Sequence, residues 1–294
     1  MYRSLADAIR DAESRGQTLA QVALDQEAKD QARSTADIRA SLTRALAVMR
    51  AAIGDGMVGD LYSSSGLVGG DAAKLMTGPP GPLADTPFRD ILARALAVQE
   101  VNAAMGVIVA APTAGGAGVL PAVLTGLAKA RSVSEEKLVD GLATAGLIGA
   151  VIAERASLSG AEGGCQAETG AAAGMAAGAA TEMLGGSPSE VGHAVALTMQ
   201  GMLGLVCDPL GGLVELPCVF RNATGSAIAL AGIEMAMAGI TFAIPVDEVI
   251  DVMGEIGREM DVRYRETAGG GLAATPTGRR LAKERLYQIR RSSE

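Results

Sequence analysis

Apolar side chains recur at spacings of three and four along most of the chain, which is the pattern of amphipathic helices. One such stripe contains Leu5, Ile9 and Ala12, and another follows Ser34, which is placed to cap the start of a helix. Residues 1–60 are therefore predicted to form two or three helices. No segment convincingly shows the alternation of apolar and polar residues that is typical of strands.

Helix start signals divide the rest of the chain into further helices. Thr86 and Pro87 predict an N-cap and a first helical residue, and this helix is expected to extend to about Val109. Capping boxes are predicted at 132–135 and at 187–190. Further helices are predicted over 135–152, 171–184 and from Asn222 to about Ile240, then from Pro245 and at the end of the chain.

These elements predict an all-α fold, a multi-helix bundle interrupted by Gly-rich ligand loops. We expect one domain over 1–294, with a helical part at 1–60, a Gly/Pro/Ser-rich loop at 62–86 and a helical core and tail at 87–294. The composition agrees, because aromatics make up 2% and Trp is absent, whereas Ala, Leu and Met favour helix. The 39 glycines are too many for helix interiors, so many are expected in caps, ligand loops or close helix contacts.

Charge and hydropathy exclude several kinds of partner. The formal net charge is −8 and no basic patch occurs before the last turns of the chain, so nucleic acid is not expected as a partner. The apolar run 142–153 is short of the about 20 residues of a membrane span, and the run 223–246 is interrupted by Glu234. With no apolar signal region and no disulfide framework, the protein is expected in the reducing cytoplasm, away from membranes.

Two Gly-rich segments are candidate ligand loops. The first contains Ser63, Ser65 and Gly66 and leads into a helix, so it is either a linker or a loop that binds an anion at the helix start. Lys74 follows it and either binds a substrate carboxylate or is a solvated helix residue. The second segment, 110–121, contains Thr113 between two apolar stretches, which favours a buried ligand loop over a simple turn.

The three cysteines lie within one stretch of the chain, and each has Gly, Pro or an acidic residue beside it or a few positions away. Cys165 and Cys207 are 42 positions apart, and Cys218 follows 11 positions later. Zinc would need a fourth ligand such as His193, and the usual close Cys pairs are absent. An iron–sulfur cluster on three thiolates would leave one iron open. Three unrelated buried thiols are the third interpretation.

The motifs around these cysteines resemble a known family. The segments are SGAEGGCQ at 159–166, LVCDPLGGLVELPC at 205–218, RNA at 221–223 and APTAG at 111–115. SSSGLVGGD at 63–71 and ETAGGGLAATPTG at 266–278 fit the same pattern. Together they resemble the α subunit of the iron–sulfur-dependent L-serine dehydratases (L-serine ammonia-lyases), over residues from about 1 to 285.

The resemblance implies a [4Fe-4S] cluster held by Cys165, Cys207 and Cys218, with the fourth iron facing the substrate. L-serine would lose its α-proton and its hydroxide to give aminoacrylate, and then pyruvate and ammonia, without pyridoxal phosphate. Glu162 and Lys74 are the candidate catalytic residues. The residues expected to bind substrate are Ser63, Ser65, Gly66, Thr113, Arg221 and Asn222.

Two departures from the family pattern shape the expected assembly. The chain has no cysteine in its tail, and it lacks the Ser-Ser-Ser-His motif whose histidine is a candidate base in single-chain members. We therefore expect the base to come from a β subunit, in a hetero-oligomer or homodimer, or from an unidentified group of this chain; His193 is more simply a packed core residue. The alternatives are β-elimination from cysteine or threonine, or a non-catalytic helical scaffold.

Overall fold

The computed structural model describes residues 2–84 and 86–292. The described residues contain no strand, and their only β-type pairings are two isolated bridges, Tyr62–Gly69 and Cys207–Arg265. The predicted all-α fold is therefore confirmed. In chain order the α-helices are α1 (Leu5–Arg15), α2 (Leu19–Gln31), α3 (Thr35–Gly56), α4 (Asp71–Thr77), α5 (Pro87–Ala103), α6 (Val119–Arg131), α7 (Glu135–Arg155), α8 (Gly160–Gly163), α9 (Ala171–Met183), α10 (Pro188–Met199), α11 (Cys218–Met237), α12 (Val246–Glu259) and α13 (Pro276–Ser292).

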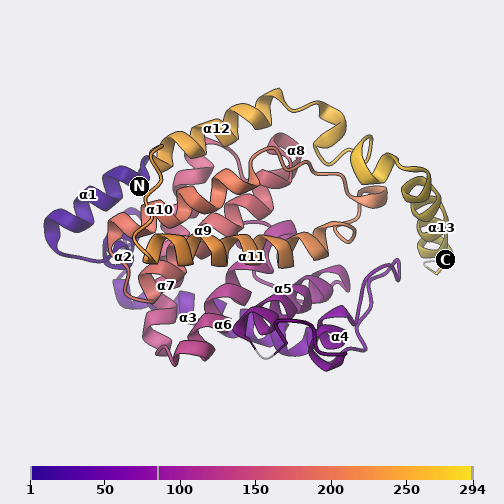
Figure 1. The fold of residues 1–294 in the computed structure, drawn as a ribbon, viewed down its shortest axis with the longest axis horizontal. Helices are drawn as coiled ribbons and strands as arrows, with labels where there is room; N and C mark the ends of the chain where they lie inside the picture. Colours follow the sequence, from indigo (N-terminus) through magenta and orange to yellow (C-terminus); the bar gives the residue numbers. More distant parts are fainter. Residues whose placement is uncertain (1, 85, 293–294) are drawn as a thin grey trace.

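Helix α9 forms the centre of the bundle, and α6, α7, α10 and α11 surround it (Figure 1). Its residues from Ala171 to Thr181 are all buried. A Cβ atom added at Gly178 would lie 2.4 Å from Ile148 Cδ1 and 2.8 Å from Val195 Cγ2. The small residues of α9 therefore let its neighbours approach closely, which explains a core built with so few aromatics.

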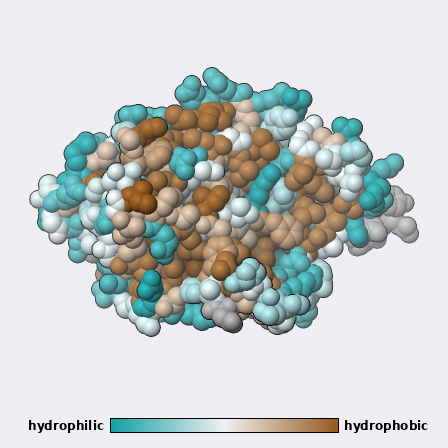
Figure 2. Space-filling view, viewed as in Figure 1, coloured by the Kyte–Doolittle hydropathy of each residue, from teal (hydrophilic) through white to brown (hydrophobic). Residues whose placement is uncertain are grey.

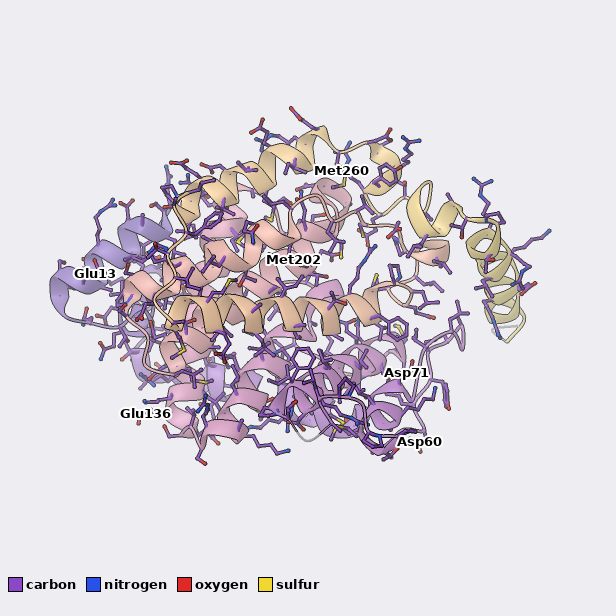
Figure 3. All side chains as sticks on the ribbon, in the orientation of Figure 1. Glu13, Asp60, Asp71, Glu136, Met202 and Met260 are labelled. Atoms are coloured by element: carbon purple, nitrogen blue, oxygen red, sulfur yellow. The ribbon has the colours of Figure 1, made fainter. Side chains whose placement is uncertain are left out.

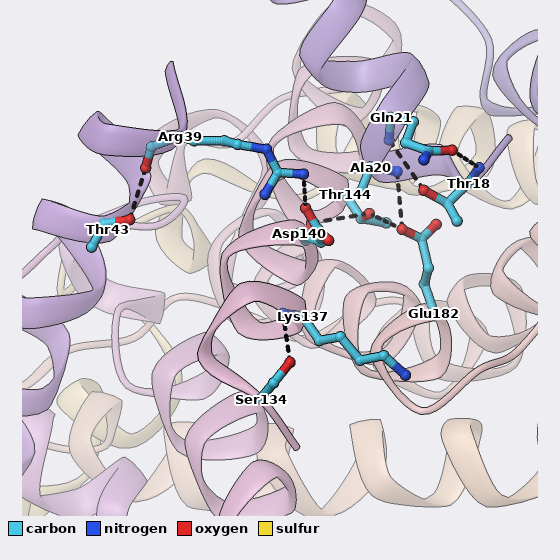
Figure 4. A network of polar contacts seen from close by, with 10 residues as sticks. All are labelled: Thr18, Ala20, Gln21, Arg39, Thr43, Ser134, Lys137, Asp140, Thr144 and Glu182. Atoms are coloured by element: carbon cyan, nitrogen blue, oxygen red, sulfur yellow. Dashed lines mark hydrogen bonds and ion pairs between the residues drawn. The ribbon is translucent and has the colours of Figure 1, made fainter. Parts of the chain in front are cut away.

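Residues 1–60 form three helices, as predicted, and a carboxylate from the core fixes the start of α2 (Figure 4). Glu182 accepts hydrogen bonds from the backbone N–H groups of Leu19 (2.8 Å) and Ala20 (2.9 Å) and from the Thr144 hydroxyl (2.9 Å). Burial raises the pKa of Glu182, and these hydrogen bonds oppose that shift. The N-terminal helices are thus attached to the core through a half-buried acid.

The structure corrects several predicted helix boundaries. Helix α5 ends at Ala103 rather than near Val109, because Met105 adopts a left-handed conformation (φ +63°) and Gly106 N–H bonds back to Val101 O at 2.8 Å. Ser134 caps α7, whereas Ser132 takes a left-handed conformation that ends α6. Helix α11 begins at Cys218, before Asn222, and ends at Met237.

The Gly/Pro/Ser-rich segment 62–86 contains helix α4, whose start is already bound by an acid of this chain. Glu100 Oε1 accepts from the backbone N–H groups of Asp71 (2.6 Å) and Ala72 (3.1 Å). Glu100 is buried, which raises the pKa of its carboxyl. The first N–H groups of α4 are therefore satisfied within the chain.

Helix α11 exposes several apolar side chains on its outer face, together with Thr224 and Glu234. Figure 2 shows apolar side chains gathered across the middle of this view, where α11 lies in Figure 1. The exposed fractions of Phe220 and Met237 are 42% and 41%. Among residues 2–84 and 86–292, no helix combines the length and the apolar character that crossing a membrane requires.

Candidate active site

The three cysteines come from three different segments and meet in the interior. Cys165 precedes a π-helical turn (Gln166–Gly170), Cys207 lies in the segment after α10, and Cys218 opens α11. All three are buried, with exposed fractions of 2%, 2% and 5%. Burial raises the pKa of each thiol, and the charge of Cys165 raises the pKa of Cys207 and Cys218 further. Cys207 Sγ lies 3.9 Å from Oε2 of Glu168, which is three positions after Cys165. Asn222 Nδ2 donates to Cys218 O and to Gly115 O, and Gly115 packs against the Glu168 carboxylate, so the three cysteine segments meet around Glu168.

The Cys165 segment is held at both of its ends by methionine side chains (Figure 3). A Cβ atom at Gly164, where φ is +75°, would lie 2.7 Å from Met260 Sδ, and one at Gly170 would lie 3.2 Å from Met202 Cβ. Gln166 donates to Met253 O (3.0 Å) and accepts from Gly204 N–H (2.9 Å). Single π-helical turns are frequent at functional sites, so this local geometry agrees with a functional role of the Cys165 segment.

The Cys207 segment is paired with the chain after α12. Cys207 N–H donates to Tyr264 O at 2.8 Å, and Glu266 N–H donates to Cys207 O at 2.9 Å. The neighbouring Asp208, which is 2% exposed, accepts from Leu272 N–H at 2.6 Å. The predicted motif at 266–278 therefore lies against the cysteine loop and fixes it.

Arg221 is the cation beside the thiols. Its Nη1 lies 2.8 Å from Asp208 Oδ1 and donates to Val206 O at 2.8 Å. The charge of Arg221 lowers the pKa of Cys165 and of Cys218. Burial has the larger, opposite effect, so the pKa of Cys218 is still raised to about 12. Arg221 thus lies at the site where the sequence places it, but Asp208 and the cysteine loop already engage part of its guanidinium. A direct contact with substrate stays a prediction.

The Ser63 loop meets the Cys218 loop through a buried acid. Ser63 Oγ donates to Glu215 Oε2 at 2.8 Å, and Ser65 Oγ donates to the same oxygen. All three residues are at most 6% exposed. Gly66, by contrast, is exposed and has a left-handed φ of +69°. The two serines therefore hold their loop against Glu215, three positions before Cys218.

Asn222 connects α11 to the loop that contains Thr113. Its Oδ1 accepts from Gly118 N–H (2.9 Å) and Gln99 Nε2 (3.3 Å), and its Nδ2 donates to Gly115 O (2.7 Å) and Cys218 O (2.9 Å). A side-chain amide has two donor and two acceptor positions, and here all four are used. The structure therefore gives Asn222 a positioning role at the site.

Glu168 is an acid of the site that the sequence did not single out, although it lies only two positions after the motif at 159–166. Its Oε2 is 3.9 Å from Cys207 Sγ, and its Oε1 accepts from Thr113 Oγ1 at 2.8 Å. A Cβ atom added at Gly115 or Gly160 would lie within 2.8 Å of this carboxylate. Burial raises the pKa of Glu168, and the nearby charge of Glu266 adds to the rise.

The predicted catalytic residues Glu162 and Lys74 lie outside this group. Glu162 is exposed and accepts from Ser157 Oγ at 2.6 Å. Lys74 is exposed and forms an ion pair with Asp71 at 2.8 Å. No recorded contact joins either side chain to the cysteines, so their catalytic roles stay predictions. His193 is half-buried and its Nδ1 accepts from Phe242 N–H at 3.3 Å.

The donor set is suited to a soft metal centre. Three buried thiols with Arg221 as their cation would repel one another as thiolates, and a bound metal group would offset that repulsion. Within the described ranges, no three His, Cys, Asp or Glu side chains converge closely enough to hold a single metal ion. A cluster does not require such convergence, because its thiolates bind different irons. Three buried cysteines are the type of ligand that an iron–sulfur cluster takes.

The fold and site define a class: all-α proteins with three buried cysteines beside an acid and between Gly-rich loops. Comparison with known proteins identifies the family. The profile of the family "Serine dehydratase alpha chain" matches residues 14–273, and the chain belongs to this family.

Relatives of two lengths are similar to this chain. The "Probable L-serine dehydratase, alpha chain" of Bacillus subtilis is 46% identical over 290 residues, which cover 97% of this chain and 95% of that protein. The "L-serine dehydratase, alpha chain" of Peptoniphilus asaccharolyticus is 46% identical over 68% of this chain and 70% of its own. The "L-serine dehydratase" of Streptomyces coelicolor is 44% identical, and the match covers 81% of this chain but 53% of that protein.

Proposed function

We propose that this chain is the cluster-binding subunit of a cytoplasmic L-serine dehydratase that converts L-serine to pyruvate and ammonia. The observation that carries the proposal is the meeting of Cys165, Cys207 and Cys218 beside Glu168 in a buried site. The 46% identity to the Bacillus subtilis protein over 97% of the chain supports the substrate and the reaction.

A [4Fe-4S] cluster is the proposed cofactor, with Cys165, Cys207 and Cys218 as its ligands. When bound, it supplies a Lewis acid that stabilises the charge on the departing hydroxide. Met202 and Met260 pack on the Cys165 segment, where their apolar side chains would help to exclude water. Exclusion of water strengthens every electrostatic interaction within the site.

Glu168 is the residue of this chain best placed to move a proton. We assign its carboxylate the acceptance of the α-proton of L-serine. Burial raises its pKa, which brings a carboxyl group closer to the neutral range in which general acids and bases are most effective. The hydrogen bond from Thr113 at 2.8 Å fixes the orientation of the carboxylate.

The reaction balances without an oxidant or reductant. The α-proton and the hydroxide leave L-serine together as water and give 2-aminoacrylate. This product tautomerises to the imine, and water then releases ammonia and pyruvate. The Ser63, Ser65 and Gly66 loop, with Arg221, is proposed to bind the substrate beside the thiols.

A second chain is proposed to complete the enzyme. Relatives of similar length are named as alpha chains. Helix α11 supports a partner surface, because its large apolar side chains Phe220 and Met237 are exposed. We propose that the β subunit covers this face and supplies a further acid–base group.

The test is an anaerobic reconstitution with iron and sulfide, followed by a pyruvate assay with L-serine, with and without the β subunit. We expect oxygen-labile pyruvate formation that is greatest with both chains. L-threonine and L-cysteine are tested in parallel, because faster turnover of either would replace L-serine as the substrate. Turnover of L-serine by metal-free or zinc-loaded protein would contradict the proposal.

A further inference from the structure

A separate cavity lies beside the thiol site, between α8 and α12. Its volume is about 340 Å³, and its charged lining consists of Glu162, Arg258 and Arg265. Pockets for small molecules have volumes of about 300–1,000 Å³, so this one suits a small ligand. Neither arginine has a role in the proposed reaction.

Glycines shape the walls of this cavity. A Cβ atom at Gly257 would lie 2.8 Å from Gly163 Cα, so the backbones of α12 and α8 are close at that point. A Cβ atom at Gly254 would lie 3.2 Å from Arg258 Nη1. The Arg258 guanidinium therefore folds back over Gly254 along the cavity wall, where Met253 supplies an apolar surface.

The two arginines have no anionic partner among the residues that the structure describes. No ion pair or hydrogen bond of the Arg258 or Arg265 side chain occurs there, and Arg265 Nε is buried without a hydrogen-bond acceptor. A buried donor without a partner is costly, so a ligand oxygen at this point would be stabilising. Glu162 receives only the Ser157 hydroxyl, at 2.6 Å on Oε2.

We propose that this cavity binds a small α-amino acid as its zwitterion. The carboxylate pairs with Arg258 and Arg265, and the ammonium pairs with Glu162. Guanidinium groups are suited to bind a carboxylate through paired hydrogen bonds. The cavity volume and the wall formed by Ala161, Ala167 and Met253 limit the ligand to a short side chain. No cysteine lines this cavity, and the proposal does not depend on the proposed reaction.

Calorimetric titration of the purified, folded protein tests this site. The probes are L-alanine, which has no hydroxyl to eliminate, and propionate, which has the carboxylate but no ammonium. We expect L-alanine to bind and propionate to bind at least about tenfold more weakly. Arg258→Gln and Glu162→Gln should each weaken L-alanine binding by about tenfold or more.

Glu255→Gln is the matched control, because Glu255 is exposed on α12 and does not line the cavity. It should bind L-alanine as the wild type does. Circular dichroism confirms that each variant is folded, and pyruvate formation by Arg258→Gln should equal that of the wild type. The proposal is overturned if L-alanine does not bind, if it binds Arg258→Gln with wild-type affinity, or if propionate binds as tightly. Binding is read without turnover, so a failure of the proposed reaction would be recognised separately.

Discussion

The Glu168 carboxylate lies 3.9 Å from the Cys207 sulfur, although these residues belong to different segments of the chain. Thr113 donates to the other carboxylate oxygen at 2.8 Å. An acid is thus placed beside a thiol of the site. Under the proposed function, this relationship gives the chain an acid–base group of its own.

Replacing Glu168 with Gln should remove proton transfer while preserving the shape of the side chain. We expect kcat to fall by roughly 10²- to 10⁴-fold, which is the usual contribution of a general acid or base. Iron content and KM should change little, and both are measured on the same anaerobic preparation. Glu136→Gln, an exposed acid labelled in Figure 3, is the control. A Glu168→Gln enzyme with the kcat of the wild type would remove Glu168 from the mechanism.

Replacing Ser63 or Ser65 with Ala should destabilise the protein. Each change removes a donor from the buried Glu215 carboxylate and should cost about 1–3 kcal/mol. Urea unfolding of the variants measures this loss. Ser64 is exposed between them, so Ser64→Ala should change the free energy of unfolding by less than about 0.5 kcal/mol. Equal effects at all three serines would contradict the role of Glu215.

Two glycines of α3 should respond in opposite directions to the same change. A Cβ atom at Gly56 would lie 2.2 Å from Ala97 O in α5, a backbone atom that cannot rotate away. Gly56→Ala should therefore destabilise the fold by about 1–3 kcal/mol. A Cβ atom at Gly54 meets nothing within 4 Å, and Gly54→Ala should stabilise the helix by about 0.5–1 kcal/mol. Thermal unfolding compares the two variants, and an opposite order would refute the close contact of α3 with α5.

Glu182 should make the stability of the protein depend on pH. Burial raises the pKa of Glu182 in the folded state above its value of about 4.5 in the unfolded chain. Between these two pKa values the folded state binds more protons than the unfolded chain. The contribution of Glu182 to stability therefore falls as the pH rises from the unfolded pKa through the folded pKa. Urea unfolding at several pH values should show a smaller decrease for Glu182→Gln than for the wild type. Identical pH profiles of the free energy of unfolding would show that the pKa of Glu182 is not raised in the folded state.

The helices were largely predictable from the sequence because their signals are local. Apolar spacing and the caps at Ser34 and Ser187 identify elements that the structure confirms. The end of α5 was missed because Met105 adopts a left-handed conformation that favours glycine. The segment 132–135 contains two serines, either of which could cap the next helix. The left-handed backbone of Ser132 ends α6, so Ser134 is the cap of α7.

The site was predictable in its cysteines but not in its acids. Cys165, Cys207 and Cys218 are the chain's only cysteines, and their motifs identified them. Glu168 is recognised as part of the site through its hydrogen bond with Thr113, which is 55 positions away. Glu215 is recognised through its hydrogen bond with Ser63, which is 152 positions away. Such pairs follow from tertiary packing, which local patterns do not contain. The signal available for Glu168 was its position three residues after Cys165, just beyond the motif at 159–166.

Iron and sulfide analysis of anaerobically reconstituted protein, with Cys207→Ala beside the wild type, tests the central claim most directly. The wild type should be brown and contain about four irons and four sulfides per chain. Cys207→Ala should lose that cluster and, with the partner chain present, its serine-dependent pyruvate formation. A colourless wild type that deaminates serine, or a Cys207→Ala variant with unchanged iron content and activity, would contradict the claim that the three cysteines hold a catalytic cluster.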